Sequence, residues 1–98
     1  NIEHVDKRFT HQLWKTNPFY KNVLKQYHLN SDMITAAVAQ LEESWRTVLM
    51  MRYSDGASLA AIGALLGMSE RAVEGRLRRA RAALKEQLQN TRSMEARS

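Results

Sequence analysis

The sequence contains no cysteine, which excludes disulfide bonds and thiolate-bound metal ions. It also lacks any apolar run near the ~20 residues that a membrane-spanning helix requires, and no signal peptide is visible at its start. We therefore expect a cytoplasmic protein without a membrane segment. With 98 residues, the chain can form one domain with a modest core, which is too little for a catalytic cleft on its own scaffold.

Patterns typical of catalytic and metal sites are missing as well. The three histidines, His4, His11 and His28, form no pair at ligand spacing with one another or with a carboxylate cluster. No serine shares a motif with a histidine, and the two glycines of AIGALLG fall within a helical pattern instead of a phosphate-binding loop. The sequence thus predicts no enzyme, no metal site and no cofactor.

Positive charge is what the sequence has in excess. The formal net charge is +5, with 15 basic against 10 acidic residues, and such a balance suits a polyanionic partner. Five arginines lie between Arg71 and Arg81, where Glu74 is the only acidic residue. This concentration in one segment favours nucleic acid as the partner more strongly than the net charge does.

The stretch that contains these arginines begins with the signals of two helices and a tight turn. Leu59, Ile62 and Leu66 repeat at helical spacing, and Gly67 follows as a typical helix stop because glycine accepts the left-handed conformation. Ser69 then stands where an N-cap residue is expected. The second helix carries an apolar stripe made of Val73, Leu77, Ala80, Leu84 and Leu88.

Two short helices so close together are typical of a helix-turn-helix motif. Gly63 supports this prediction, because glycine inside a helix costs roughly 1 kcal/mol relative to alanine and needs a reason. We expect that a side chain at this position would collide with the second helix. An ordinary helical hairpin with a chance glycine is the alternative.

At about 100° per residue, the second helix turns arginines and small residues away from its apolar stripe. Opposite the stripe lie Arg71, Gly75, Arg78 and Ala82, with Glu74 and Arg79 on the shoulders. Arginine can bind guanine through two hydrogen bonds, and small residues let the backbone approach the groove. Arg76 and Arg81 border the stripe, so their heads are expected to reach phosphates or a neighbouring helix. Solvated surface, or an ion pair between Glu74 and Arg78, is the plainer interpretation.

Three stretches resemble region four of bacterial sigma factors, most closely the extracytoplasmic-function group. The first, LEESWRTVLMMRY at Leu41–Tyr53, is similar to the family helix L-P-x-x-x-R-x-V-L-x-L-R-Y. The second, DGASLAAIGALLGMS at Asp55–Ser69, is similar to G-x-S-x-x-E-I-A-x-x-L-G-x-S. The third, AVEGRLRRARAAL at Ala72–Leu84, is similar to T-V-K-S-R-L-x-R-A-R-x-x-L and is the most specific.

The resemblance implies a domain that reads the minus-35 promoter element in the major groove and docks on the beta flap of the RNA polymerase core. It also implies an anti-sigma factor as a possible partner, and phosphates held by backbone amides near Ser58 and Ser69. The sequence departs from the family pattern at Glu42, Ala61, Gly63, Glu74 and Gly75. The last two lie on the predicted reading face, so the promoter sequence does not carry over.

The complete chain predicts a small all-α fold with an N-terminal helical arm and a C-terminal helix-turn-helix. The arm covers residues 1–30, where Val5, Phe9 and Leu13 mark one short helix and Asn17-Pro18 begins another. The domain covers residues 31–90 and contains a turn at residues 54–56. Residues 91–98 are polar and predict a frayed tail. The apolar side chains of the arm are expected to cover the core of the domain.

Two other functions remain open at this stage. The chain could be a sigma-like interaction module that binds polymerase or an anti-sigma factor without reading DNA, as Glu74 and the unmatched arm suggest. It could also be an activator of the response-regulator type, although such proteins lack the R-A-R-x-x-L run. Binding to duplex DNA that depends on salt would separate the sigma-like reader from the interaction module.

Overall fold

The computed structural model describes the backbone of residues 5, 7–16 and 31–97, and side chains for residues 5, 8–13, 15 and 32–90. Its α-helices are α1 (Lys7–Thr16), α3 (Ser31–Ala39), α4 (Glu43–Leu49), α5 (Leu59–Leu66) and α6 (Glu70–Arg97). A π-helix, η1 (Met50–Ser54), continues directly from α4. The described part of the chain contains no strand, which confirms the predicted all-α class. Among these helices, none has the length and apolar character needed to cross a lipid bilayer.

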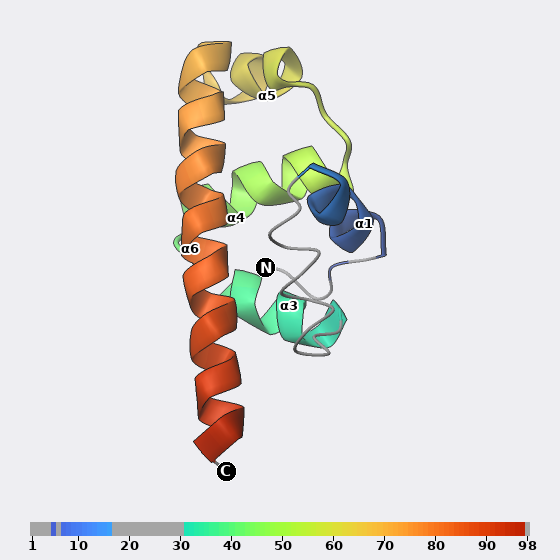
Figure 1. The fold of residues 1–98 in the computed structure, drawn as a ribbon. Helices are drawn as coiled ribbons and strands as arrows, with labels where there is room; N and C mark the ends of the chain where they lie inside the picture. The colour runs from blue at the N-terminus through green and yellow to red at the C-terminus, as the bar shows by residue number, and fades with distance from the viewer. Residues whose placement is uncertain (1–4, 6, 17–30, 98) are drawn as a thin grey trace.

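Helix α6 is the element against which α3, α4 and α5 all pack. It runs along one side, with α5 beside its N-terminal end and α4 and then α3 packed further along it (Figure 1). The predicted apolar stripe from Val73 to Leu88 is buried along its whole length. The periodicity that predicted this helix therefore also identified the face that packs on the other helices.

A single core joins the domain to the described part of the arm. Val5, Phe9 and Leu13 are fully buried in the same cluster as residues of α3, α4, η1, α5 and α6. The Val5 N–H also donates to Thr35 Oγ1 at 2.9 Å, which ties the chain before α1 to α3. Because a buried Phe or Leu contributes roughly 1.5–3 kcal/mol, α1 adds substantially to stability. The expected packing of this helix is confirmed, whereas the second arm helix, over residues 17–30, lies outside the described residues.

The join between α4 and the turn differs from the prediction. An ordinary helix was expected to continue to Tyr53, but the backbone opens into a π-helix in which the Asp55 N–H donates to Met50 O at 3.0 Å. The Ala57 N–H reaches still further back, to Met51 O. The expected turn follows at once, with Gly56 at φ 71°. The wider turn places the Tyr53 side chain in the core.

The helical backbone of α6 extends past Leu88, the last residue of its apolar stripe, to Arg97. It includes most of residues 91–98, for which the frayed tail stays a prediction. No glycine or proline follows Gly75 to interrupt the helix, and most of the later residues have good helix propensity. Helix propensity therefore continues α6 beyond the end of its apolar stripe.

Candidate nucleic-acid interface

The turn between α5 and α6 is built by the residues that predicted it. The Ser58 hydroxyl accepts a hydrogen bond from the Ala61 N–H and caps α5. Gly67 ends this helix in the left-handed conformation, at φ 68°. The Ser69 hydroxyl then accepts from the Ala72 N–H at 3.1 Å and caps α6. These capping bonds confirm the predicted start of each helix and fix both N-termini of the motif.

Gly63 lies within α5 and is buried against the turn that leads to α6. A Cβ atom at this position would lie 2.5 Å from the carbonyl oxygen of Met68. Its own carbonyl accepts a hydrogen bond from the Met68 N–H at 2.8 Å. The predicted close contact is confirmed, but its partner is the backbone of the turn and not the body of the second helix.

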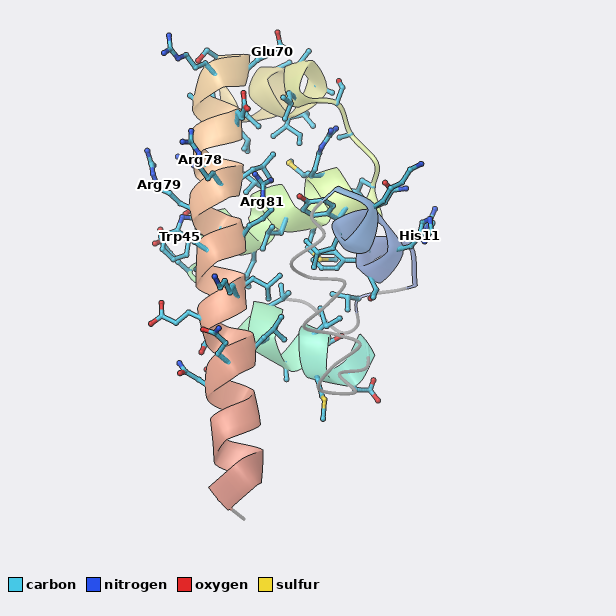
Figure 2. All side chains as sticks on the ribbon, viewed as in Figure 1. His11, Trp45, Glu70, Arg78, Arg79 and Arg81 are labelled. Atoms are coloured by element: carbon cyan, nitrogen blue, oxygen red, sulfur yellow. The ribbon has the colours of Figure 1, made fainter. Side chains whose placement is uncertain are left out.

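The outward arginines of α6 share one exposed surface. Arg71, Glu74, Arg78 and Arg79 are exposed around the half-buried Gly75, and we call these five residues the outer face of α6. Arg78 and Arg79 point away from the rest of the molecule (Figure 2). None of the four charged side chains forms a hydrogen bond or ion pair with another described residue, so the Glu74–Arg78 ion pair that the spacing allows is not formed.

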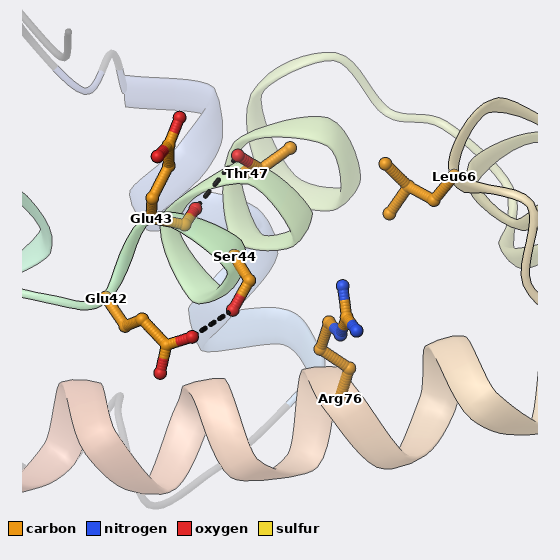
Figure 3. A pocket seen from close by; sticks show the side chains of 6 residues that line it. All are labelled: Glu42, Glu43, Ser44, Thr47, Leu66 and Arg76. Atoms are coloured by element: carbon orange, nitrogen blue, oxygen red, sulfur yellow. Dashed lines mark hydrogen bonds between the residues drawn. The ribbon is translucent and has the colours of Figure 1, made fainter.

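The other two predicted arginines lie on opposite flanks of α6 and face the protein. Arg81 Nη1 donates to the Tyr53 hydroxyl oxygen at 3.1 Å. Arg76 points into a pocket of about 490 Å³ between α4, α5 and α6 (Figure 3). The pocket is also lined by Glu42, Glu43, Ser44, Thr47 and Leu66. The two positions that bordered the apolar stripe in the sequence therefore have different surroundings.

The structure thus separates the nine predicted site residues into three groups. The outer face contains five of them, Ser58 and Ser69 lie at the N-terminal ends of α5 and α6, and Arg76 and Arg81 are turned towards other helices. Sequence reasoning missed the role of Tyr53 as the partner of Arg81. In the sequence Tyr53 is only the last residue of the Leu41–Tyr53 stretch, which says nothing about where its hydroxyl points.

Sequence reasoning also missed the outer surface of α5. This helix carries no charged side chain, and its exposed side consists of Ala60, Ala61, Ala64 and Leu65. Leu65 is 71% exposed and is the one exposed large apolar residue among those whose side chains the structure describes. The run LAAIGALL could have indicated this surface, because it has no polar residue for the side of the helix that faces outward.

The described residues contain no cluster of histidine, cysteine and carboxylate side chains that could hold a metal ion. Comparison with protein families matches residues 31–84, just over half of the chain, to "Sigma-70, region 4". Neither a curated protein nor a solved structure matches the chain. The match starts at the first residue of α3 and ends within α6, so it spans the whole helix-turn-helix. The chain therefore belongs to the sigma-70 region 4 family, which comprises DNA-binding regulatory domains and not enzymes.

Proposed function

We propose that this chain is the promoter-recognition domain of a sigma factor or sigma-like regulator, and that the outer face of α6 reads the minus-35 element. The observation that carries the proposal is the group of unpaired outward arginines around Gly75. A helix that enters the major groove needs donors for guanine and a close backbone approach. Arg71, Arg78 and Arg79 supply the donors, and Gly75 leaves room between them.

Phosphate contacts would come from the two capped helix starts. The first backbone N–H groups of a helix have no partner within it, and the helix dipole makes this end attractive to anions. Because the Ser58 and Ser69 hydroxyls already accept hydrogen bonds from their own helices, the neighbouring amides are the better candidates to hold phosphates. Arg76 is proposed as a further phosphate contact, for which its side chain would turn out of the pocket between α4, α5 and α6.

The proposed partners follow from the family and from the motif resemblance. They are double-stranded promoter DNA, the beta flap of the RNA polymerase core and an anti-sigma factor, in the cytoplasm. Within the family, we assign the chain to the extracytoplasmic-function group because of the run AVEGRLRRARAAL at Ala72–Leu84. The promoter sequence itself depends on Glu74 and Gly75, which replace the residues common in the family pattern.

A sigma-like interaction module remains the second candidate function, and two observations favour it. Glu74 adds a negative charge to the outer face of α6, where it would lie near DNA phosphates. The exposed side of α5 is uncharged and carries Leu65, whereas a helix that crosses a DNA backbone commonly presents polar or basic groups. Both features favour another protein as the binding partner over a polyanion such as DNA.

Selection from a random duplex pool separates the two functions. The chain is incubated with the pool, bound duplexes are amplified over several rounds, and the affinity for the enriched and a scrambled duplex is measured at two salt concentrations. We expect one enriched sequence and a logarithmic salt slope of about −0.9 for each phosphate contacted. Absence of any enriched sequence would refute DNA reading and favour the interaction module.

A further inference from the structure

Tyr53 lies where three parts of the molecule meet. The residue belongs to the π-helix η1 and is 3% exposed. The ring of Phe9, from α1, packs edge-on against it, with centroids 5.6 Å apart and planes at 69°. Its hydroxyl oxygen accepts the hydrogen bond from Arg81 of α6. The side chain therefore connects the arm, through η1, to the helix that carries the outer face.

The geometry of Arg81 fits a structural attachment better than a phosphate contact. Figure 2 shows Arg81 on the side of α6 that faces α1 and α4, whereas Arg78 and Arg79 leave the other side. Its guanidinium is partly buried and donates to a neutral hydroxyl. Hydrogen bonds of charged donors are the stronger ones, and this bond spans 28 residues of sequence. It attaches α6 to η1 at a point one turn after Arg78.

We propose that Tyr53 is a positioning residue for DNA reading: through Arg81 it sets the rotation of α6, and through Phe9 it makes that setting depend on a docked α1. This inference rests on the proposed function. A small rotation of α6 would move Arg78 and Arg79 relative to base edges but would leave the number of phosphate contacts unchanged. Loss of the Tyr53 hydroxyl should therefore reduce sequence discrimination and spare nonspecific, salt-dependent binding.

The test compares Tyr53→Phe, Arg81→Ala, their double variant and Phe9→Leu in the complete chain. Each variant is titrated with the duplex enriched by the wild-type chain and with its scrambled form, at two salt concentrations and a temperature at which all variants are folded by circular dichroism. Val38→Ala is the control, because Val38 is fully buried in α3 and its truncation lowers stability while the Tyr53 and Arg81 side chains remain complete.

We expect Tyr53→Phe and Arg81→Ala each to lower the ratio of cognate to scrambled affinity by roughly tenfold, the order of one hydrogen bond to a charged group. The double variant should lose no more than either single variant, and the salt slope should stay at the wild-type value. Phe9→Leu should lower the ratio by a smaller factor. Val38→Ala should lower the melting temperature and keep the ratio.

Several results would overturn the inference. If Arg81→Ala reduces the salt slope by about one unit while Tyr53→Phe keeps the ratio, Arg81 is a phosphate contact. If Val38→Ala loses discrimination equally, stability and not positioning explains the effect. If the two single losses add, Tyr53 and Arg81 act independently and not through their shared hydrogen bond. An unchanged ratio in Phe9→Leu would remove α1 from the account. If the wild-type chain enriches no sequence, both the proposed function and the positioning role of Tyr53 are refuted. If the wild-type chain enriches a sequence but Tyr53→Phe keeps the wild-type ratio of cognate to scrambled affinity, only the positioning role is refuted.

Discussion

Gly63 and Gly75 lie on the two consecutive helices of one motif, yet a side chain would meet opposite conditions at the two positions. At Gly63 a Cβ atom would be 2.5 Å from a backbone carbonyl, whereas at Gly75 the nearest atom is Arg79 Nη2 at 3.9 Å. The packed side of the motif therefore requires its glycine for the fold. On the outer face of α6 the fold does not require a glycine, which agrees with the proposed close approach of DNA to this surface.

Substitution of Gly63 should have the largest effect on stability. In an open helix Gly→Ala stabilises by up to about 1 kcal/mol, but here the new methyl group meets backbone that cannot move aside. We expect Gly63→Ala to lower the free energy of unfolding by about 1–3 kcal/mol, and Gly63→Leu to lower it further or prevent folding. Urea denaturation measures both. Wild-type stability in Gly63→Ala would show that the turn can move away.

Truncation of outward arginines should have the largest effect on binding. Arg78→Ala and Arg79→Ala should each cost about 1–3 kcal/mol of affinity for the enriched duplex and relax preference at one base pair. Stability should change little, because both side chains are exposed and make no bond to another described residue. Gln89→Ala is the matched control, since Gln89 is an exposed residue further along the same helix. Equal losses on enriched and scrambled duplexes would contradict base reading by these two arginines.

Removal of the helix caps should have a moderate effect. Ser69→Ala deletes the acceptor of the Ala72 N–H, and Ser58→Ala that of the Ala61 N–H. Each is expected to cost about 1 kcal/mol of stability, while Ser→Gly at the same positions should cost only a few tenths. Thermal unfolding of the four variants tests this. If alanine and glycine proved equivalent, the serine hydroxyls would not be capping these helices in solution.

Gly75→Ala should give the smallest change. It should raise the stability of the chain and weaken its binding to DNA. Because the added methyl group has room, the variant should unfold at a slightly higher temperature, by up to about 1 kcal/mol in stability. The same methyl group should hinder close approach of the backbone to the groove and weaken binding to the enriched duplex. A variant that binds as tightly as wild type would show that no surface approaches α6 closely at this point.

Sequence reasoning succeeded where a residue type has one local use. Gly67 as a helix stop, Ser69 as a cap and the stripe from Val73 to Leu88 all follow from backbone conformation and helical periodicity. The same reasoning separated the outer face from the buried face of α6, because that division depends only on the helical repeat.

It failed where structure depends on contacts distant in the sequence. The π-helix at Met50–Ser54 differs from an α-helix in its backbone hydrogen bonds and not in a characteristic residue pattern, so the sequence does not predict it. The stripe placed Arg76 and Arg81 at equivalent borders, but one lines a pocket and the other bonds to Tyr53. Which of these occurs is decided by the elements packed against each flank, and a single helix does not contain that information.

If the outer face of α6 is the surface that binds DNA, NMR should locate the contact there. The isotopically labelled chain is titrated with the enriched duplex while the backbone amide signals are followed. We expect the largest changes in amide chemical shift from Ser69 to Arg79 and at the start of α5, and small changes in α1 and α3. Shifts confined to α1, α3 or the exposed side of α5, with the signals from Arg71 to Arg79 unchanged, would contradict this expectation.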